Sequence, residues 1–113
     1  MKIICVPKDS IAEKRLEYDL AESDELIELN FEDESFYKLW NTGFFNSINK
    51  MIGIIIDDFE DEHISNITEI KKVIDSDIFS NYSLDKKLDI ITEKIKSLFE
   101  EAYKRKTSIR FFF

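Results

Sequence analysis

The residues most capable of chemistry stand in one acidic run, Asp57-Asp58-Phe59-Glu60-Asp61-Glu62. Carboxylate oxygens are preferred ligands of Mg²⁺ and Ca²⁺, so a metal site is one interpretation of the run. The EF-hand pattern requires Gly at its sixth position and Glu at its twelfth, whereas those positions, counted from Asp57, hold Glu62 and Thr68. A nuclease carboxylate site is disfavoured too, because neighbouring acids in a tight run splay apart and no recognisable motif supplies a Lys or His partner. The remaining interpretations are an exposed binding surface and a helix start that Asp57 or Asp58 caps.

Other reactive residue types are scarce. His63 is the only histidine, which excludes a multi-histidine metal site within one chain, and we expect it at the surface or beside a helix. Cys5, the only cysteine, lies in an apolar run without a nearby base and is predicted to be a buried, unreactive thiol. Gly43 and Gly53 are the only glycines, which excludes a glycine-rich phosphate loop. We therefore predict no enzymatic activity, no catalytic residue, no metal site and no cofactor.

Charge is distributed unevenly along the chain. The 113 residues carry a formal net charge of −8, but residues 1–62 alone carry 16 acids and 6 bases. A second group of acids lies between Arg15 and Lys38, where no basic residue occurs: Glu17, Asp19, Glu22, Asp24, Glu25, Glu28, Glu32, Asp33 and Glu34. An acidic surface repels nucleic acid and attracts basic proteins, so we expect a basic protein partner and no direct binding of nucleic acid.

The elements that position these residues follow from hydrophobic periodicity. Strands are predicted at 2–6, 27–31 and 107–113, where β-branched and aromatic residues are dense or alternate with polar ones. Helices are predicted over 36–52, with a break at Asn41-Thr42-Gly43 and an end at Gly53, and over 67–74, with Asn66 and Glu69 as a capping box. The longest helix is predicted to follow a Ser83 cap, with an apolar stripe formed by Leu84, Leu88, Ile91, Ile95, Leu98 and Ala102.

One segment and two groups of aromatic residues keep alternative interpretations. Residues 11–21 fit a helix begun by a Ser10–Glu13 capping box, but Leu16, Tyr18 and Leu20 alternate with charges as in a strand. Tyr37 and Trp40 are expected in the core, with an interface anchor as the alternative. The closing Phe residues, 111–113, indicate either a strand covered on both faces or an exposed edge used for pairing.

Together these elements predict an α/β (α+β) layered fold in a single globular domain, 1–113. The sheet would have three or four strands including both termini, packed by about three helices. Because strands joined through a helix commonly lie parallel, the terminal strand is expected parallel to the N-terminal one. One cysteine and no long apolar segment favour a protein of the cytoplasm with neither a disulfide nor a membrane span.

Two stretches carry a resemblance to a known group of proteins. Phe44-Phe45-Asn46-Ser47-Ile48-Asn49, followed by Ile56-Asp57-Asp58-Phe59-Glu60-Asp61-Glu62-His63-Ile64, resembles the immunity proteins of bacterial contact-dependent growth inhibition systems. The aromatic strand Ile109-Arg110-Phe111-Phe112-Phe113 after a long helix is similar as well, and it also gives a more distant similarity to the barstar-type ribonuclease inhibitors. The resemblance implies a small cytoplasmic antidote that binds a basic toxin domain, in many such systems a nuclease. The partner-binding residues that it implies are Asp57, Asp58, Glu60, Asp61 and Glu62.

Two other classes of function remain as alternatives to an immunity protein. One is a metal-dependent enzyme or metal-binding module that uses the acidic run at 57–62. The other is a regulatory interaction domain without a toxin partner. A toxin gene directly upstream would favour the immunity protein.

Overall fold

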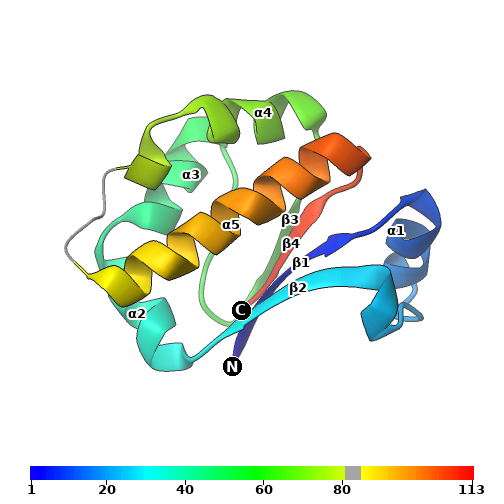
Figure 1. The fold of residues 1–113 in the computed structure, drawn as a ribbon, viewed down its shortest axis with the longest axis horizontal. Helices are drawn as coiled ribbons and strands as arrows, with labels where there is room; N and C mark the ends of the chain where they lie inside the picture. Colours follow the sequence, from blue (N-terminus) through cyan, green and yellow to red (C-terminus); the bar gives the residue numbers. More distant parts are fainter. Residues whose placement is uncertain (81–84) are drawn as a thin grey trace.

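The computed structural model describes residues 1–80 and 85–113. In this part the chain folds as a compact α+β domain built on one four-stranded sheet (Figure 1), as the sequence predicts. The strands are β1 (Lys2–Pro7), β2 (Leu26–Phe31), β3 (Asp61–Ile64) and β4 (Ile109–Phe112). The helices are α1 (Ser10–Glu17), α2 (Asp33–Asn41), α3 (Phe44–Ile52), α4 (Ile67–Asp75) and α5 (Lys86–Arg105), with short 3₁₀ turns η1 (Ser23–Glu25) and η2 (Ile78–Ser80).

The α-helices of the described residues number five, more than the three or so that the sequence predicts. Residues 11–21, which fit either a helix or a strand, contribute α1. Its N-cap is Asp9, whose carboxylate accepts a hydrogen bond from the Ala12 N–H (2.8 Å), and not Ser10. The predicted break at Gly43, which has a φ of +86°, divides the 36–52 helix into α2 and α3.

The remaining helix boundaries follow local sequence signals. Gly53 ends α3 with a φ of +70°, and the Asn66 side chain caps α4 by accepting from the Glu69 N–H (3.1 Å), both as predicted. The described start of α5 is capped by the carboxylate of Asp85. The predicted cap Ser83 and the first stripe residue, Leu84, lie outside the described residues.

The strand order is β2-β1-β4-β3, and every neighbouring pair is antiparallel. Pairing of the terminal strand with the N-terminal one is confirmed, but the predicted parallel direction is wrong. The prediction assumed one helix between paired strands, whereas β3 and β4 are joined through both α4 and α5, which run side by side in opposite senses (Figure 1). Two such helices return the chain to the end where it left the sheet, so β4 runs antiparallel to β3. Strand β1 runs in the same direction as β3, and β4 is therefore antiparallel to β1 as well.

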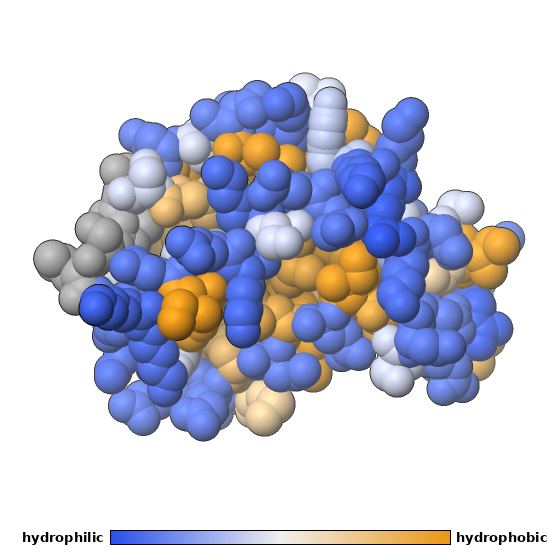
Figure 2. Space-filling view, viewed as in Figure 1, coloured by the Kyte–Doolittle hydropathy of each residue, from blue (hydrophilic) through white to orange (hydrophobic). Residues whose placement is uncertain are grey.

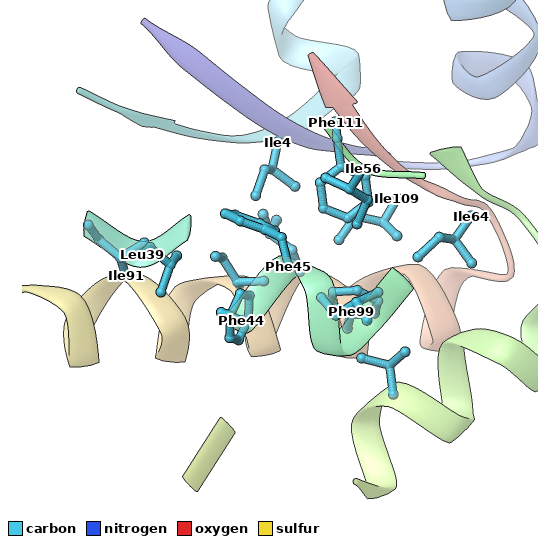
Figure 3. Packing of buried hydrophobic residues seen from close by; sticks show 14 of the residues in the cluster. Ile4, Leu39, Phe44, Phe45, Ile56, Ile64, Ile91, Phe99, Ile109 and Phe111 are labelled. Carbon is cyan, nitrogen blue, oxygen red and sulfur yellow. The ribbon is translucent and has the colours of Figure 1, made fainter. Parts of the chain in front are cut away.

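The core lies between the sheet and the layer formed by α2, α3, α4 and α5 (Figure 3). Ile4 of β1 and Phe111 of β4 point from the sheet into this layer and are fully buried. The predicted α5 stripe is confirmed at its described positions, all of them buried: Leu88, Ile91, Ile95, Leu98 and Ala102. The opposite face of the sheet carries α1, whose Glu13 and Glu17 lie 3.9 and 3.6 Å from the Arg110 guanidinium.

The closing aromatic residues lie in the middle of the sheet and not at an edge, because β4 is flanked by β1 and β3. Phe111 is fully buried, while Phe112 and Phe113 are half-buried on or near the sheet. The alternative of an exposed pairing edge at 111–113 is therefore wrong. Residues Phe36, Phe45 and Phe111 surround the Phe113 ring with centroid distances of 4.8 to 5.7 Å.

Candidate functional site

The acidic run forms the turn after α3 together with the first two residues of β3; it is here called the acidic turn (residues 57–62). Buried side chains hold both of its ends, because Ile56 precedes it and Ile64 follows it in the core. The Asn49 side chain clamps the first of these ends: its amide donates to the Ile56 carbonyl (3.0 Å), and its oxygen accepts from the Ile56 N–H (2.7 Å). Both ends of the acidic turn are therefore anchored to the core.

The prediction that Asp57 or Asp58 caps a helix is wrong, since Asp61 begins strand β3. Residues 61–64 pair with β4 in antiparallel register, His63 opposite Arg110 and Ile64 opposite Ile109. Local sequence favours a helix start at such acids, but the available edge of β4 takes the segment into the sheet. The chain reverses at Phe59, which has a left-handed φ of +63°.

Asp58 is held within the fold. Its carboxylate pairs with the ammonium of Lys2, a side chain only 6% exposed, and accepts a hydrogen bond from the Tyr37 hydroxyl (2.6 Å). Lys2 also donates to the main-chain oxygen of Phe113 (2.8 Å), and the same oxygen accepts from the Phe59 N–H (3.0 Å). The hydrogen bonds from Lys2 and then from Tyr37 lower the pKa of Asp58 below its ordinary value. This network ties the acidic turn to both ends of the chain.

The other predicted residues divide by exposure. Glu62 is half-buried and its carboxylate accepts from the N–H groups of Ile55 (3.3 Å) and His63 (2.9 Å). Asp57 is exposed and its carboxylate bonds only to the next N–H of the turn, while Glu60 and Asp61 are exposed with no ion pair in the described part of the chain. The structure thus separates two acids with a structural role from three that face solvent.

Sequence reasoning missed the apolar part of this site. Phe59 stands among the acids with 86% of its surface exposed, and Ile55, on the approach to the turn, is 67% exposed. The buried ammonium of Lys2 lies 5.1 Å from the Phe59 ring centroid, a cation–π distance that orients the ring. The sequence signal for this residue was an aromatic side chain inside an acidic run, because a run that only faces solvent is not stabilised by an exposed aromatic ring.

The fold also brings the second acidic group toward the first. The start of α2 carries Glu32, Asp33 and Glu34, and one turn later Tyr37 reaches across to Asp58. Asp33 pairs with the amino group of Met1 (3.2 Å), which lies next to Lys2. Of the second group, the acids at the start of α2 therefore lie beside the acidic turn, next to Tyr37. Tyr37 is 44% exposed and not a core residue as predicted. Trp40, by contrast, packs against the core.

The reactive residue types lie apart from this surface. Cys5 is buried, which confirms that part of the prediction. Burial first, then the Glu28 charge, raises the pKa of its thiol to about 11, which disfavours the reactive thiolate. His63 is exposed on β3, as expected. Within residues 1–80 and 85–113, no three His, Cys, Asp or Glu side chains gather as a metal ion would require.

Comparisons with protein-family models, with curated proteins and with solved structures find no match. Among the described residues, no helix combines the length and the apolar character needed to cross a membrane.

Proposed function

We propose that this protein is a non-enzymatic immunity protein of the bacterial cytoplasm, which binds and neutralises a cognate toxin domain with a basic surface. The observation that carries the proposal is the acidic turn itself. It presents Asp57, Glu60 and Asp61 to solvent around the exposed ring of Phe59. This combination of charges around an apolar anchor is typical of interfaces between proteins.

A basic partner follows from the electrostatics of the turn. A nuclease cleft is positive because it must hold phosphates, so an acidic surface attracts the cleft, accelerates encounter and occupies the place of the substrate. The start of α2 enlarges the same surface with Glu32 and Glu34. Binding of nucleic acid by this surface is disfavoured by the same charges.

Rigidity supports the proposal as well. Asn49 clamps one end of the turn, and the Lys2–Asp58 pair holds its middle against the main-chain oxygen of Phe113. A turn already ordered in the free protein loses little conformational entropy on binding. We assign the partner contacts to Asp57, Glu60, Asp61 and Phe59, with Asp58 and Glu62 as the acids that hold the turn in shape.

The test is the kinetics of binding to the toxin domain encoded beside this gene. Neutralising Asp57, Glu60 and Asp61 together, to Asn, Gln and Asn, is expected to slow association about tenfold at low salt and to reduce its salt dependence. Phe59→Ala is expected to accelerate dissociation instead, since an apolar anchor acts after encounter. Surface plasmon resonance at several salt concentrations measures both rates.

Matched controls lie at the opposite end of β1. Asp19, Glu22 and Asp24 are exposed, and their neutralisation removes the same charge as the test triple without changing the acidic turn. The control for Phe59→Ala is Tyr18→Ala, since Tyr18 lies beside Asp19 and is 68% exposed. If the control triple slows association as much as the test triple, only net charge matters and the assigned site is wrong. If the neighbouring toxin domain does not bind at all, the immunity function is wrong.

A further inference from the structure

A groove separates strand β2 from helix α5, away from the acidic turn. Strand β2 is one of the two outer strands of the sheet, and no strand within the described residues pairs with its free edge. Figure 2 shows apolar surface exposed in this region, between hydrophilic side chains on either side. Two adjoining hollows of about 270 and 400 Å³ lie here, and both are lined by Leu29, Asn30 and Lys94.

The groove has an apolar floor and one basic wall. Its floor is formed by Ile27, Leu29 and Phe31 from β2 together with Ile91 and Leu98 from α5. Ile90, 53% exposed, stands on the α5 side, where Lys87 and Lys94 form the wall. Acids lie at the rim on the β2 side, where Glu28 and Glu32 line the two hollows. An occupant is therefore expected to place apolar side chains on the floor, because the floor itself is apolar.

The backbone of β2 offers hydrogen bonds at the free edge. The Lys8 N–H donates to the Glu25 carbonyl (3.0 Å), which continues the β1–β2 register by one residue pair. Hydrogen-bonded pairs alternate with pairs that make no bonds in an antiparallel ladder, so Leu29 directs its polar backbone groups at β1. The N–H and C=O groups of Glu28 and Asn30 accordingly point outward, where another strand would receive them.

The charge of β2 indicates which kind of strand would pair with its free edge. Glu28 pairs with Cys5 in the register, so its side chain leaves the sheet on the face opposite Leu29; the residue is exposed and lies at the rim of one hollow. A residue paired with Glu28 would share that face, and the next residue would point into the groove, because side chains alternate along a strand. We propose that the β2 edge and the groove form a docking site for an extended segment of a protein partner, in which basic residues alternate with apolar ones.

A second copy of this chain fits the edge poorly. Residues 16–37, which contain β2, hold nine acids and no base, so two copies paired at this edge would bring like charges together. A segment with basic residues would instead be attracted by the acids of residues 16–37. The proposal does not depend on the toxin partner, since no residue of the acidic turn lines the groove; the two surfaces adjoin at Glu32, which lines one of the hollows.

The experiment uses a synthetic peptide of alternating Val and Lys, added to the full-length, ¹⁵N-labelled protein. Backbone amide signals of Glu28 and Asn30 are expected to shift, and their hydrogen exchange to slow, as the peptide accepts their N–H bonds. A block peptide of the same composition, with all Val before all Lys, is expected to bind about tenfold more weakly because it cannot satisfy both faces at once.

Two variants test the two parts of the site. Glu28→Lys removes the attraction on the outer face, and Ile90→Lys adds a cation at the groove; each is expected to weaken binding of the alternating peptide about fivefold or more. Ile11→Lys is the matched control, since Ile11 is 70% exposed on α1, and it should leave affinity unchanged. Equal binding of both peptides, or shifts confined to residues 57–62, would overturn the proposal. Concentration-dependent dimers abolished by Glu28→Lys would also overturn it in favour of a second copy.

Discussion

At the scale of residues, Lys2 is the side chain on which the acidic turn depends. It is nearly buried, yet it keeps its charge satisfied by Asp58, by the main-chain oxygen of Phe113 and by the face of the Phe36 ring, 4.7 Å from its nitrogen. Residues 2, 58 and 113 are far apart in sequence, so this one ammonium joins three separate segments. Loss of its partner would leave a charge in a place with little access to water.

The first prediction concerns the pH dependence of this network. The pKa of Asp58 is lower in the folded protein, so its contribution to stability is present above the unfolded-state value of about 3.9 and is lost as pH falls through the folded-state value. Asp58→Asn is therefore expected to lower the free energy of unfolding at neutral pH and to lose this effect in acid. Urea melts from about pH 7 to about pH 2 measure the difference.

Asp57→Asn is the control, because the neighbouring carboxylate bonds only to the turn itself. Its unfolding free energy should follow that of the native protein at every pH. A gap between native protein and Asp58→Asn that is as large in acid as at neutral pH would show that the ionised carboxylate of Asp58 does not stabilise the fold.

At the scale of elements, α5 has two faces with different roles. Its central stripe, including Ile91, Ile95 and Leu98, packs under the sheet and supplies core. The flanking positions 87, 90 and 94 face the groove along β2 and remain accessible. Helix stability therefore resides in one face, and the other is available for binding.

The second prediction tests this division. Ile95 is fully buried, and Ile95→Ala is expected to lower the free energy of unfolding by about 2–5 kcal/mol through lost burial and the cavity left behind. Ile90→Ala, five residues earlier and 53% exposed, is expected to change it by only about 0.5 kcal/mol. Urea melts of both variants provide the comparison; equal losses would mean that the two faces do not differ in burial.

At the scale of the whole molecule, charge is unevenly distributed: acids dominate residues 1–62, and most lysines lie in residues 63–113. Acids gather on the acidic turn and at the start of α2. Helices α4 and α5 carry acids as well, but they also expose most of the lysines of the second half: Lys71, Lys72, Lys86, Lys87, Lys94, Lys96 and Lys104. A molecule with this uneven charge is oriented by the field of a basic partner before contact. The acidic turn is then the leading surface in an encounter.

The third prediction is that the purified protein does not hydrolyse RNA or DNA, with or without Mg²⁺. Its one histidine is exposed on β3, and its one cysteine is buried with a raised thiol pKa, so neither provides an activated nucleophile or base. Incubation with labelled substrates checks this. Cleavage that is lost in Asp61→Asn while the circular dichroism spectrum is unchanged would instead establish the metal-dependent enzyme.

Local features of the chain could be predicted from the sequence because each depends on a few neighbouring residues. The buried stripe around Ile95, the break at Gly43 and the cap at Asn66 arise from helical periodicity, left-handed backbone and a side-chain hydrogen bond within three residues. The acidic run was visible in the same way. So were a sheet containing both termini and the burial of Cys5.

Tertiary structure alone decided how these parts combine. The antiparallel direction of β4 depends on two helices returning together, and the strand at 61–64 exists because β4 offers it an edge. The roles of the acids were likewise hidden, since Asp58 meets Lys2 across 56 positions of sequence while Asp61 meets solvent. A residue's chemistry is set by its type, but its partners are set by which distant segments the core brings beside it.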